Sequence, residues 1–443
     1  MNSPRFSFRY INGIAIPAIV SGVIEPVLSL TDTAIVGNVS VNATQALAAV
    51  GLAGSFIATL GWIFTQSKVA VAALVAEYLG KNQLDKIIGL PAQMIGINIV
   101  LGCLVYFITY GSSVWIFKFY NADGLVLDYT VSYYKIRALG FPMLLFIVSV
   151  FSVFRGLQNT FWPMIVSLTG AVLNIILDVV LVYGVKGFIP AMHVEGAAWA
   201  SVFSQLVMFV FALVLLFLKT PFRLKISFKT HPQLKRTLSI SANMLVRTIA
   251  LNVSLVMANT YATKYGPSYI AAFTIAFQIW LFFAFFMDGY ASVSAIISGK
   301  LKGEKNYKEL SLLVNTIMKY TLGVSLLLLI VFTFAYPYVG FVFTKDKEVI
   351  SIFTSFFWMV LLMQPLNAVT FVYDDVFKGM AEAVTLRNTL LVATFVGFVP
   401  TLMIFDFLGF KMLGIWMAFV VWMFIRAVIL HFKLKNILNL NLE

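Results

Sequence analysis

Charged side chains are scarce in this chain of 443 residues, because only 11% are Asp, Glu, Lys or Arg and 61% are hydrophobic. A soluble globular domain has about 25% charged residues. The shortage therefore excludes a soluble fold and predicts a chain that lies mostly in lipid. A transmembrane helix needs roughly 20 apolar residues, so a chain of this length can hold about a dozen of them.

Cysteine and histidine are also scarce. Cys103 is the single cysteine and lies in an apolar run, so it has no disulfide partner within the chain. His193, His231 and His431 are too scattered to form a metal site. No phosphate-binding glycine motif and no nucleophile–base constellation occur, so we expect neither an enzyme nor a bound cofactor or metal.

Long apolar segments bounded by charges or turn residues predict twelve membrane-spanning helices. They are expected at about 10–38, 46–78, 87–112, 126–150, 160–184, 194–218, 235–264, 269–299, 308–336, 348–377, 385–406 and 411–432. A basic linker at 219–234 divides the chain into an N-terminal lobe of six helices (1–218) and a C-terminal lobe of six (235–443).

The net charge of +13 would suggest nucleic-acid binding in a soluble protein. In a membrane protein, the orientation of the chain in the membrane explains such an excess of positive charge. Lysine and arginine gather on the cytoplasmic loops of membrane proteins. Here they gather at the N-terminus (Arg5, Arg9), in the linker and in every second loop. We therefore predict a multi-pass protein of the cell (inner) membrane with both termini in the cytoplasm, and we expect no nucleic acid.

The two halves repeat each other. Three landmarks recur at the same sequence offset: Leu79–Lys81 with Lys302–Glu304, Pro142 with Pro365, and Phe154–Leu157 with Phe377–Met380. Six helices per repeat give both halves the same orientation, so the repeats are parallel. Parallel repeats of this kind are typical of secondary transporters, which place the substrate between the two halves.

Ionisable side chains inside predicted spans are candidates for function, because a charge near the bilayer centre costs about 2.5–3.5 kcal/mol. Asp32 and Asp178 both lie about 30 Å from the cytoplasmic ends of their helices at ~1.5 Å per residue. Asn174 precedes Asp178 by one helical turn. Burial and a neighbouring like charge favour a protonated carboxyl, so these three residues are the candidate proton or cation site. The second half of the chain lacks the pair.

Asp288, Lys68 and Glu25 are secondary candidates for coupling or substrate binding. Pro17 and Pro26 interrupt the backbone hydrogen bonds of the first helix and make it a candidate hinge. Structural alternatives stay open. Asp32 and Asp178 could be hydrogen-bonding groups between helices, and Glu25 could satisfy donors freed by Pro26. We expect Asp374 and Asp375 to form a helix-end cluster with Lys378 and Arg387, and Lys319 and Arg426 to snorkel or to pair structurally.

Five segments together resemble the multidrug and toxic compound extrusion (MATE) family, and specifically its DNA-damage-inducible protein F (DinF-type) branch. They are Leu30–Gly37, Phe154–Thr160, Asn174–Asp178, Met287–Ala291 and Phe371–Gly379. The resemblance covers nearly the whole chain. It implies an all-α integral membrane protein of twelve helices in two six-helix lobes, which exports organic cations or other amphipathic compounds by antiport. It also implies that Asp32, Asn174 and Asp178 form the cation site.

Two departures from the family pattern concern the coupling ion. Other branches carry an acidic residue in the seventh helix, whereas Asn243–Thr260 contains Arg247 and no carboxylate. Asp375 stands where the branch usually has glycine, and Lys68 has no counterpart that we can place. The absence of the acidic residue argues against a sodium site in the C-terminal lobe and favours H⁺ over Na⁺.

The sequence therefore predicts a secondary active antiporter that works by alternating access, as a monomer in membrane lipid. Its expected partners are amphipathic or cationic small molecules and a coupling ion. The expected ion is H⁺, and Na⁺ is the less favoured alternative. The alternative is a flippase for a lipid-linked intermediate of the same superfamily. A flippase needs a basic cavity for an anionic headgroup, and Arg247, Lys68 and Arg426 keep this alternative open. The two-lobe repeat disfavours a channel.

Overall fold

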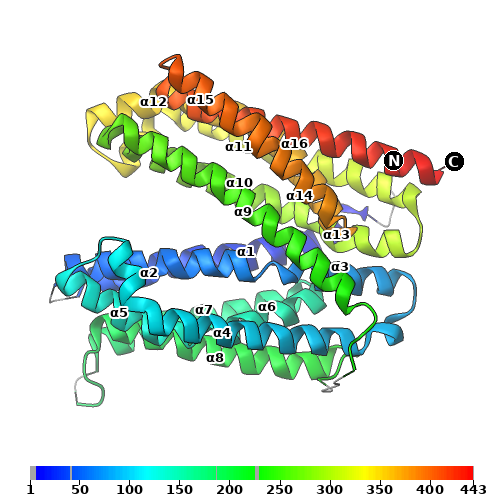
Figure 1. Ribbon diagram of the computed structural model, residues 1–443, viewed down its shortest axis with the longest axis horizontal. Coiled ribbons are helices and arrows are strands. Elements are labelled where there is room, and N and C mark those ends of the chain that lie inside the picture. The colour runs from blue at the N-terminus through cyan, green and yellow to red at the C-terminus, as the bar shows by residue number, and fades with distance from the viewer. Residues whose placement is uncertain (1–5, 40–41, 186, 225–228, 443) are drawn as a thin grey trace. The chain divides into compact units, whose positions relative to one another are not determined.

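The computed structural model describes residues 6–39, 42–185, 187–224 and 229–442, apart from the side chains of residues 25, 26, 29, 30, 33, 337, 342 and 442 (Figure 1). Arg5 and linker residues 225–228 lie outside these ranges. In the described ranges the chain is helical, and its one isolated β-bridge joins Val185 and Ile189.

The helices of the first half are α1 (Phe8–Gly37), α2 (Ala43–Phe64), α3 (Ser67–Gly80), η2 (Leu84–Ile87), α4 (Gly89–Phe119), α5 (Gly124–Ala138), α6 (Phe141–Gly156), α7 (Phe161–Tyr183) and α8 (His193–Lys219). Those of the second half are α9 (Leu234–Tyr265), α10 (Pro267–Gly303), α11 (Tyr307–Phe343), α12 (Lys347–Leu362), α13 (Gln364–Gly379), α14 (Ala383–Val392), η3 (Ala393–Phe398), α15 (Val399–Phe407) and α16 (Lys411–Leu442).

The described helices confirm an all-α membrane fold. Nine spans are long and apolar enough to cross a membrane, and the count is eleven if each of two bent pairs is one span. Helix α1 is a further long helix of 30 residues, and its segment Phe8–Ile24 is a shorter apolar helix. Several predicted spans consist of two shorter helices in sequence, such as α2 with α3 and α14 with α15, so the number of helices exceeds the number of spans.

The two bent spans occupy equivalent places in the two halves. Helices α5 and α6 meet at 46°, and α12 and α13 meet at 48°. In both spans the second helix has a proline in its first turn, Pro142 in α6 and Pro365 in α13. Proline is tolerated there because the first N–H groups of a helix have no partner within it. The repeated prolines of the sequence thus mark repeated bends.

The ends of α3 and α10 contact each other through a reciprocal pair of glycines. A Cβ atom added to Gly80 would lie 2.0 Å from the carbonyl oxygen of Lys300. One added to Gly303 would lie 2.1 Å from the carbonyl oxygen of Glu77. Backbones can approach this closely only where no side chain intervenes. Glu77 and Gly80 correspond to Lys300 and Gly303 in the repeat. In each half, therefore, the glycine contacts the carbonyl oxygen of the equivalent residue in the other half.

A second pair of equivalent glycines makes a close backbone contact within each half. A Cβ atom on Gly156 of α6 would lie 2.7 Å from the carbonyl oxygen of Ala72 in α3. A Cβ atom on Gly379 of α13 would lie 2.3 Å from the carbonyl oxygen of Ala295 in α10. These four residues follow the sequence repeat as well, so the repeat has a counterpart in backbone packing.

The chain forms two compact units. The N-terminal unit comprises Val20–Val75 and Gln83–Leu238, and the C-terminal unit comprises Met1–Ile19, Ala76–Asn82 and Ser239–Glu443. Helix α1 and helix α3 each contribute residues to both units, which a division by sequence order does not anticipate. The division of the chain at the 219–234 linker stays a prediction about the repeats.

Candidate functional site

The predicted coupling residues meet inside the N-terminal unit. Asp32 lies on α1, and Asn174 and Asp178 lie one turn apart on α7. Their exposed fractions are 7%, 2% and 0%, so all three are buried. Unpaired carboxylates are costly to bury, so the packing around them must supply partners or protons.

Ser201 of α8 joins the two helices. Its hydroxyl donates a hydrogen bond to Asp32 Oδ2 at 3.4 Å and accepts one from Asn174 Nδ2 at 3.4 Å. Sequence reasoning missed this residue, since a serine in an apolar helix carries no charge to mark it. The available signal is the small-residue run Gly196–Ala198 just before it, which lets α8 pack closely on α7.

The carboxyl groups of Asp32 and Asp178 lie close enough to interact with each other directly. No donor among the described residues reaches either oxygen of Asp178 or the Oδ1 atom of Asp32, and all three oxygens are buried. An ionised carboxylate only accepts hydrogen bonds. A bond between the two therefore requires that one of them carry a proton.

Arg137 is a further charged residue of this cluster that sequence reasoning missed. It lies in the last turn of α5, close enough to interact electrostatically with Asp32 and Asp178. Its Nε atom is buried and has no hydrogen-bond partner in the described part of the chain. Arg137 stands inside the predicted span 126–150, and its charge there is the sequence signal that marks it. With Arg137, the ionised cluster carries one net negative charge.

The cluster faces away from the surface groove that runs along α1. This groove encloses about 450 Å³ and is lined by Val27, Thr31, Ala34, Ile35, Asn38 and Tyr183. Asp32 lies instead on the buried face of α1, together with Val36. Neither carboxyl group is among the residues that line the groove.

The secondary candidates are distributed over both units. Lys68 is exposed near the start of α3 in the N-terminal unit. Pro17 is buried in α1, and the side chains of Glu25 and Pro26 lie outside the described residues. Asp288 is exposed on α10 in the C-terminal unit, where it interacts electrostatically with residues of α13 rather than with the predicted coupling residues.

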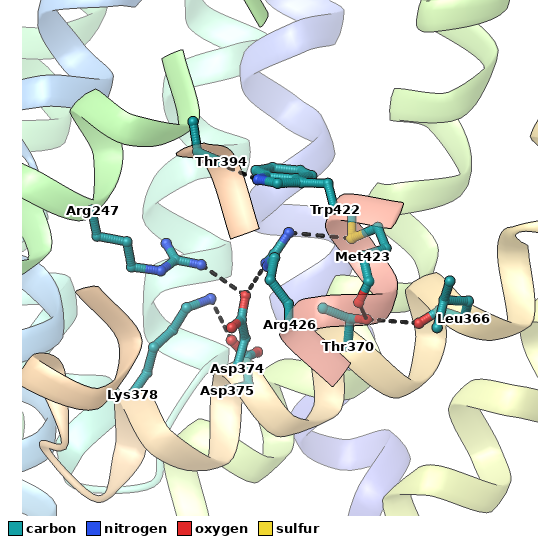
Figure 2. Close-up of polar contacts among 10 residues, drawn as sticks. All are labelled: Arg247, Leu366, Thr370, Asp374, Asp375, Lys378, Thr394, Trp422, Met423 and Arg426. Carbon is teal, nitrogen blue, oxygen red and sulfur yellow. Dashed lines mark hydrogen bonds and ion pairs between the residues drawn. The ribbon is translucent and has the colours of Figure 1, made fainter. Parts of the chain in front are cut away.

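The C-terminal unit holds an ion-pair network of its own (Figure 2). Asp374 of α13 binds two guanidinium groups through one oxygen, Oδ2. Arg247 of α9 lies 2.7 Å from it, and Arg426 of α16 also bonds to it. Beside them, Lys378 Nζ lies 2.5 Å from Asp375 Oδ1. The network ties α9, α13 and α16 together inside the unit.

The partners of Asp374 differ from those expected. Its side chain is 5% exposed and pairs with the two arginines, whereas the sequence placed it in a helix-end cluster with Lys378 and Arg387. Arg387 instead donates hydrogen bonds to Asn243 and Asn388. The expected pairing of Arg426 is found, but deep inside the unit. Sequence depth alone did not reveal that α9 and α16 flank α13.

Arg426 also contacts two uncharged groups, an aromatic ring and a thioether sulfur. Its guanidinium lies 4.6 Å from the ring centre of Trp422 and donates to the sulfur of Met423 at 3.2 Å. Trp422 in turn donates to the hydroxyl of Thr394 at 3.1 Å (Figure 2). An aromatic face and a thioether stabilise a cation without neutralising it. Asp374 is therefore shared by two guanidinium groups whose charges it only half compensates.

Comparison with known proteins gives a consistent picture. Residues 17–180 and 240–408 match the family described as MatE. DNA damage-inducible protein F of Escherichia coli (strain K12) is 22% identical over 426 residues, which cover 94% of this chain and 89% of that protein. Protein DETOXIFICATION 42 of Arabidopsis thaliana is 28% identical over 297 residues, or 67% of this chain. The match spans little more than half of the plant protein, 56% of its length.

A solved structure described as MATE in the bent conformation superposes with a TM-score of 0.89. The superposition covers 98% of this chain and 96% of that one, at 19% sequence identity. At 19% identity this likeness shows the fold alone. The shared fold agrees with the all-α arrangement that the sequence predicts.

Proposed function

This chain belongs to the MatE family, and we propose that it is a secondary active transporter that exports amphipathic or cationic organic compounds in exchange for protons. The observation that carries the proposal is the buried pair of Asp32 and Asp178, whose carboxyl groups lie close enough to interact directly. A pair that needs a proton to hold together is suited to bind and release one during a transport cycle.

A proton suits this cluster better than Na⁺ does. The proton occupies the hydrogen bond between the two carboxyl groups, whereas a hard metal cation needs about six oxygen ligands around it. The fixed positive charge of Arg137 also opposes a second cation at close range. One bound proton leaves the cluster of Asp32, Asp178 and Arg137 without net charge, which is the state that costs least to bury.

The proposed cycle couples protonation to the position of α1. When protonated, Asp32 and Asp178 hold α1 against α7. When both are ionised, their repulsion favours separation of the helices and entry of water behind α1. Pro17 and Pro26 provide the proposed hinge, since each removes a backbone hydrogen bond inside the continuous helix from Phe8 to Gly37. If Pro26→Ala transports like the wild type, the hinge is wrong while the proton site stands.

A vesicle assay tests the coupling ion. Proteoliposomes that contain the purified protein receive either a pH gradient or a Na⁺ gradient, and uptake of tetraphenylphosphonium is measured. We expect uptake with the pH gradient and none with Na⁺ alone. Asp32→Asn and Asp178→Asn should each abolish the uptake, while Asp128→Asn, an exposed aspartate of α5, should not. Full activity of both cluster variants would refute the site, and uptake driven by Na⁺ would refute the ion.

We further propose that the protein lies in the inner membrane with both termini in the cytoplasm. The proposal rests on the gathering of lysine and arginine on one set of loops. A cysteine placed at residue 438 in a Cys103→Ser background should react with a membrane-impermeant maleimide only in inside-out vesicles. Labelling in right-side-out vesicles would contradict this orientation.

Two of the three cations that kept the flippase alternative open are not available to a headgroup, and the third, Lys68, is exposed near the start of α3. A flippase needs cations that are available to an anionic headgroup, but Arg247 and Arg426 are buried and both engage Asp374. Export of small molecules therefore remains the proposed function.

A further inference from the structure

The C-terminal network is balanced in charge only if Asp288 is included. Arg247, Arg426 and Lys378 contribute three positive charges, and Asp374 and Asp375 contribute two negative ones. Asp288 of α10 supplies the third negative charge, since it interacts electrostatically with both Asp375 and Lys378. Buried charges need such compensation.

Asp288 differs from the other members of the network because it is exposed. The side chains of Arg247, Arg426, Asp374 and Asp375 are each less than one-tenth exposed, and that of Lys378 is 24% exposed. Asp288 is exposed although it lies near the middle of α10. It is therefore the member that a molecule outside the packed helices can reach.

A carboxylate at this depth is costly against lipid, so it faces water or a counter-charge. Its side of α10 is largely apolar and accessible. Phe285 lies one turn before Asp288 and Leu281 two turns before, and both are only half-buried. An aromatic and aliphatic stripe that ends at a carboxylate has the chemistry to hold a lipophilic organic cation.

We propose that Asp288 binds the positively charged group of a transported organic cation, and that Lys378 is a built-in competitor that weakens this binding. The proposal rests on the function proposed above, since it names the substrate group recognised by the C-terminal unit. Lys378 forms an ion pair with Asp375 and also interacts electrostatically with Asp288. The positive charge of its ammonium group therefore offsets part of the attraction between Asp288 and a substrate cation. Weakened binding helps an exporter to release its substrate.

Charge arithmetic ranks the variants. Asp288→Asn leaves the network with one net positive charge, the wild type is neutral, and Lys378→Gln leaves one net negative charge. Affinity for a monovalent cation should therefore rise in that order. Asp288→Glu and Lys378→Arg retain the charges and should bind like the wild type.

Equilibrium binding to purified protein in nanodiscs tests the ranking without any ion gradient. The probes are tetraphenylphosphonium, which is cationic, and triphenylphosphine oxide, which is neutral and of similar shape. We expect Asp288→Asn to weaken binding of the cation by about tenfold or more, the effect of losing a charged partner, and to leave the neutral probe unaffected. Asp406→Asn removes a carboxylate elsewhere in the unit, where it pairs with Lys264, and serves as the matched control.

Two results would overturn the proposal: wild-type affinity of Asp288→Asn for the cation, or equal loss of both probes. Lys378→Gln leaves Asp375 without its partner, so Lys302→Gln, which breaks the pair with Glu382, controls for a lost lysine. If Lys378→Gln does not fold, the comparison of Asp288→Asn with Asp288→Glu still decides.

The same samples separate this inference from the proposed function. Asp32→Asn should bind tetraphenylphosphonium like the wild type but fail to transport it. Binding that depends on Asp288 in a protein without gradient-driven uptake would refute the antiporter and leave the binding site. Gradient-driven uptake with unchanged binding by Asp288→Asn would refute the binding site and leave the antiporter.

Discussion

Gly80 and Gly303 occupy equivalent positions in the two repeats and lie against each other's helix. A Cβ atom built on Gly303 would be 3.2 Å from the Cα atom of Gly80, as well as in collision with the carbonyl oxygen of Glu77. The contact joins the ends of α3 and α10 in the C-terminal unit. Neither position therefore has room for a side chain, because each added Cβ atom would collide with a backbone carbonyl of the other helix.

Gly80→Ala and Gly303→Ala should each destabilise the protein. The added methyl group meets backbone atoms that cannot rotate away, and overpacking of this kind costs typically about 1–3 kcal/mol. Thermal unfolding in detergent, followed by tryptophan fluorescence, measures the loss. Gly96→Ala in α4 is the control, because no atom lies within 4 Å of its added Cβ. It should be neutral or slightly stabilising, since alanine favours helix. A wild-type unfolding midpoint for both α3 and α10 variants would contradict the close contact.

Ser201→Ala should slow proton-driven uptake several-fold without abolishing it. The hydroxyl positions Asp32 and Asn174 by neutral hydrogen bonds, each of which contributes about 1 kcal/mol. Initial rates of tetraphenylphosphonium uptake under a pH gradient provide the measurement. Ser204→Ala is the matched control one turn away, since the Ser204 hydroxyl donates only to the backbone carbonyl of Ser201. Equal rates for the two variants would show that Ser201 has no positioning role.

The buried triad of Arg247, Asp374 and Arg426 predicts unequal effects of its variants. Asp374→Asn leaves two guanidinium groups buried without a counter-charge and should cost about 3–5 kcal/mol or prevent folding. Arg426→Met leaves one balanced pair, Arg247 with Asp374, and removes the half-compensated cation, so it should cost much less. Expression level and unfolding midpoint of the two variants, compared side by side, check this order. The reverse order would mean that Arg426 is the essential partner of Asp374.

The sequence predicted what depends on position along a helix and missed what depends on which helices are neighbours. Hydrophobic length placed the spans, and helix depth placed Asp32 and Asp178 at one level, where the structure brings them into contact. Ser201 and Asp374 show the limit. Ser201 acquires its role only because α8 packs on α7 beside α1. Asp374 meets Arg247 and Arg426 from helices far apart in sequence, and no periodicity specifies that packing.

The division of α1 between the two units could not have been predicted from the sequence either. Its residues up to Ile19 cluster with the C-terminal unit and those from Val20 with the N-terminal unit. Hydrophobicity assigns all of α1 to one span, because the pattern of apolar residues is continuous across this boundary. The allocation depends on long-range contacts such as that of Asn12 with Tyr290 of α10, whose hydroxyl donates at 2.9 Å.

Arg137→Gln should weaken the preference for protons over Na⁺. Without the guanidinium, the ionised pair of Asp32 and Asp178 has no fixed positive charge beside it, so any small cation is attracted more strongly. We expect the variant to show uptake driven by a Na⁺ gradient that the wild type lacks, together with slower uptake under a pH gradient. Arg137→Lys keeps the charge and should keep the selectivity. If Arg137→Gln loses all transport with both gradients while it still binds tetraphenylphosphonium, the arginine is needed for the cycle itself, and selection against Na⁺ is not its role.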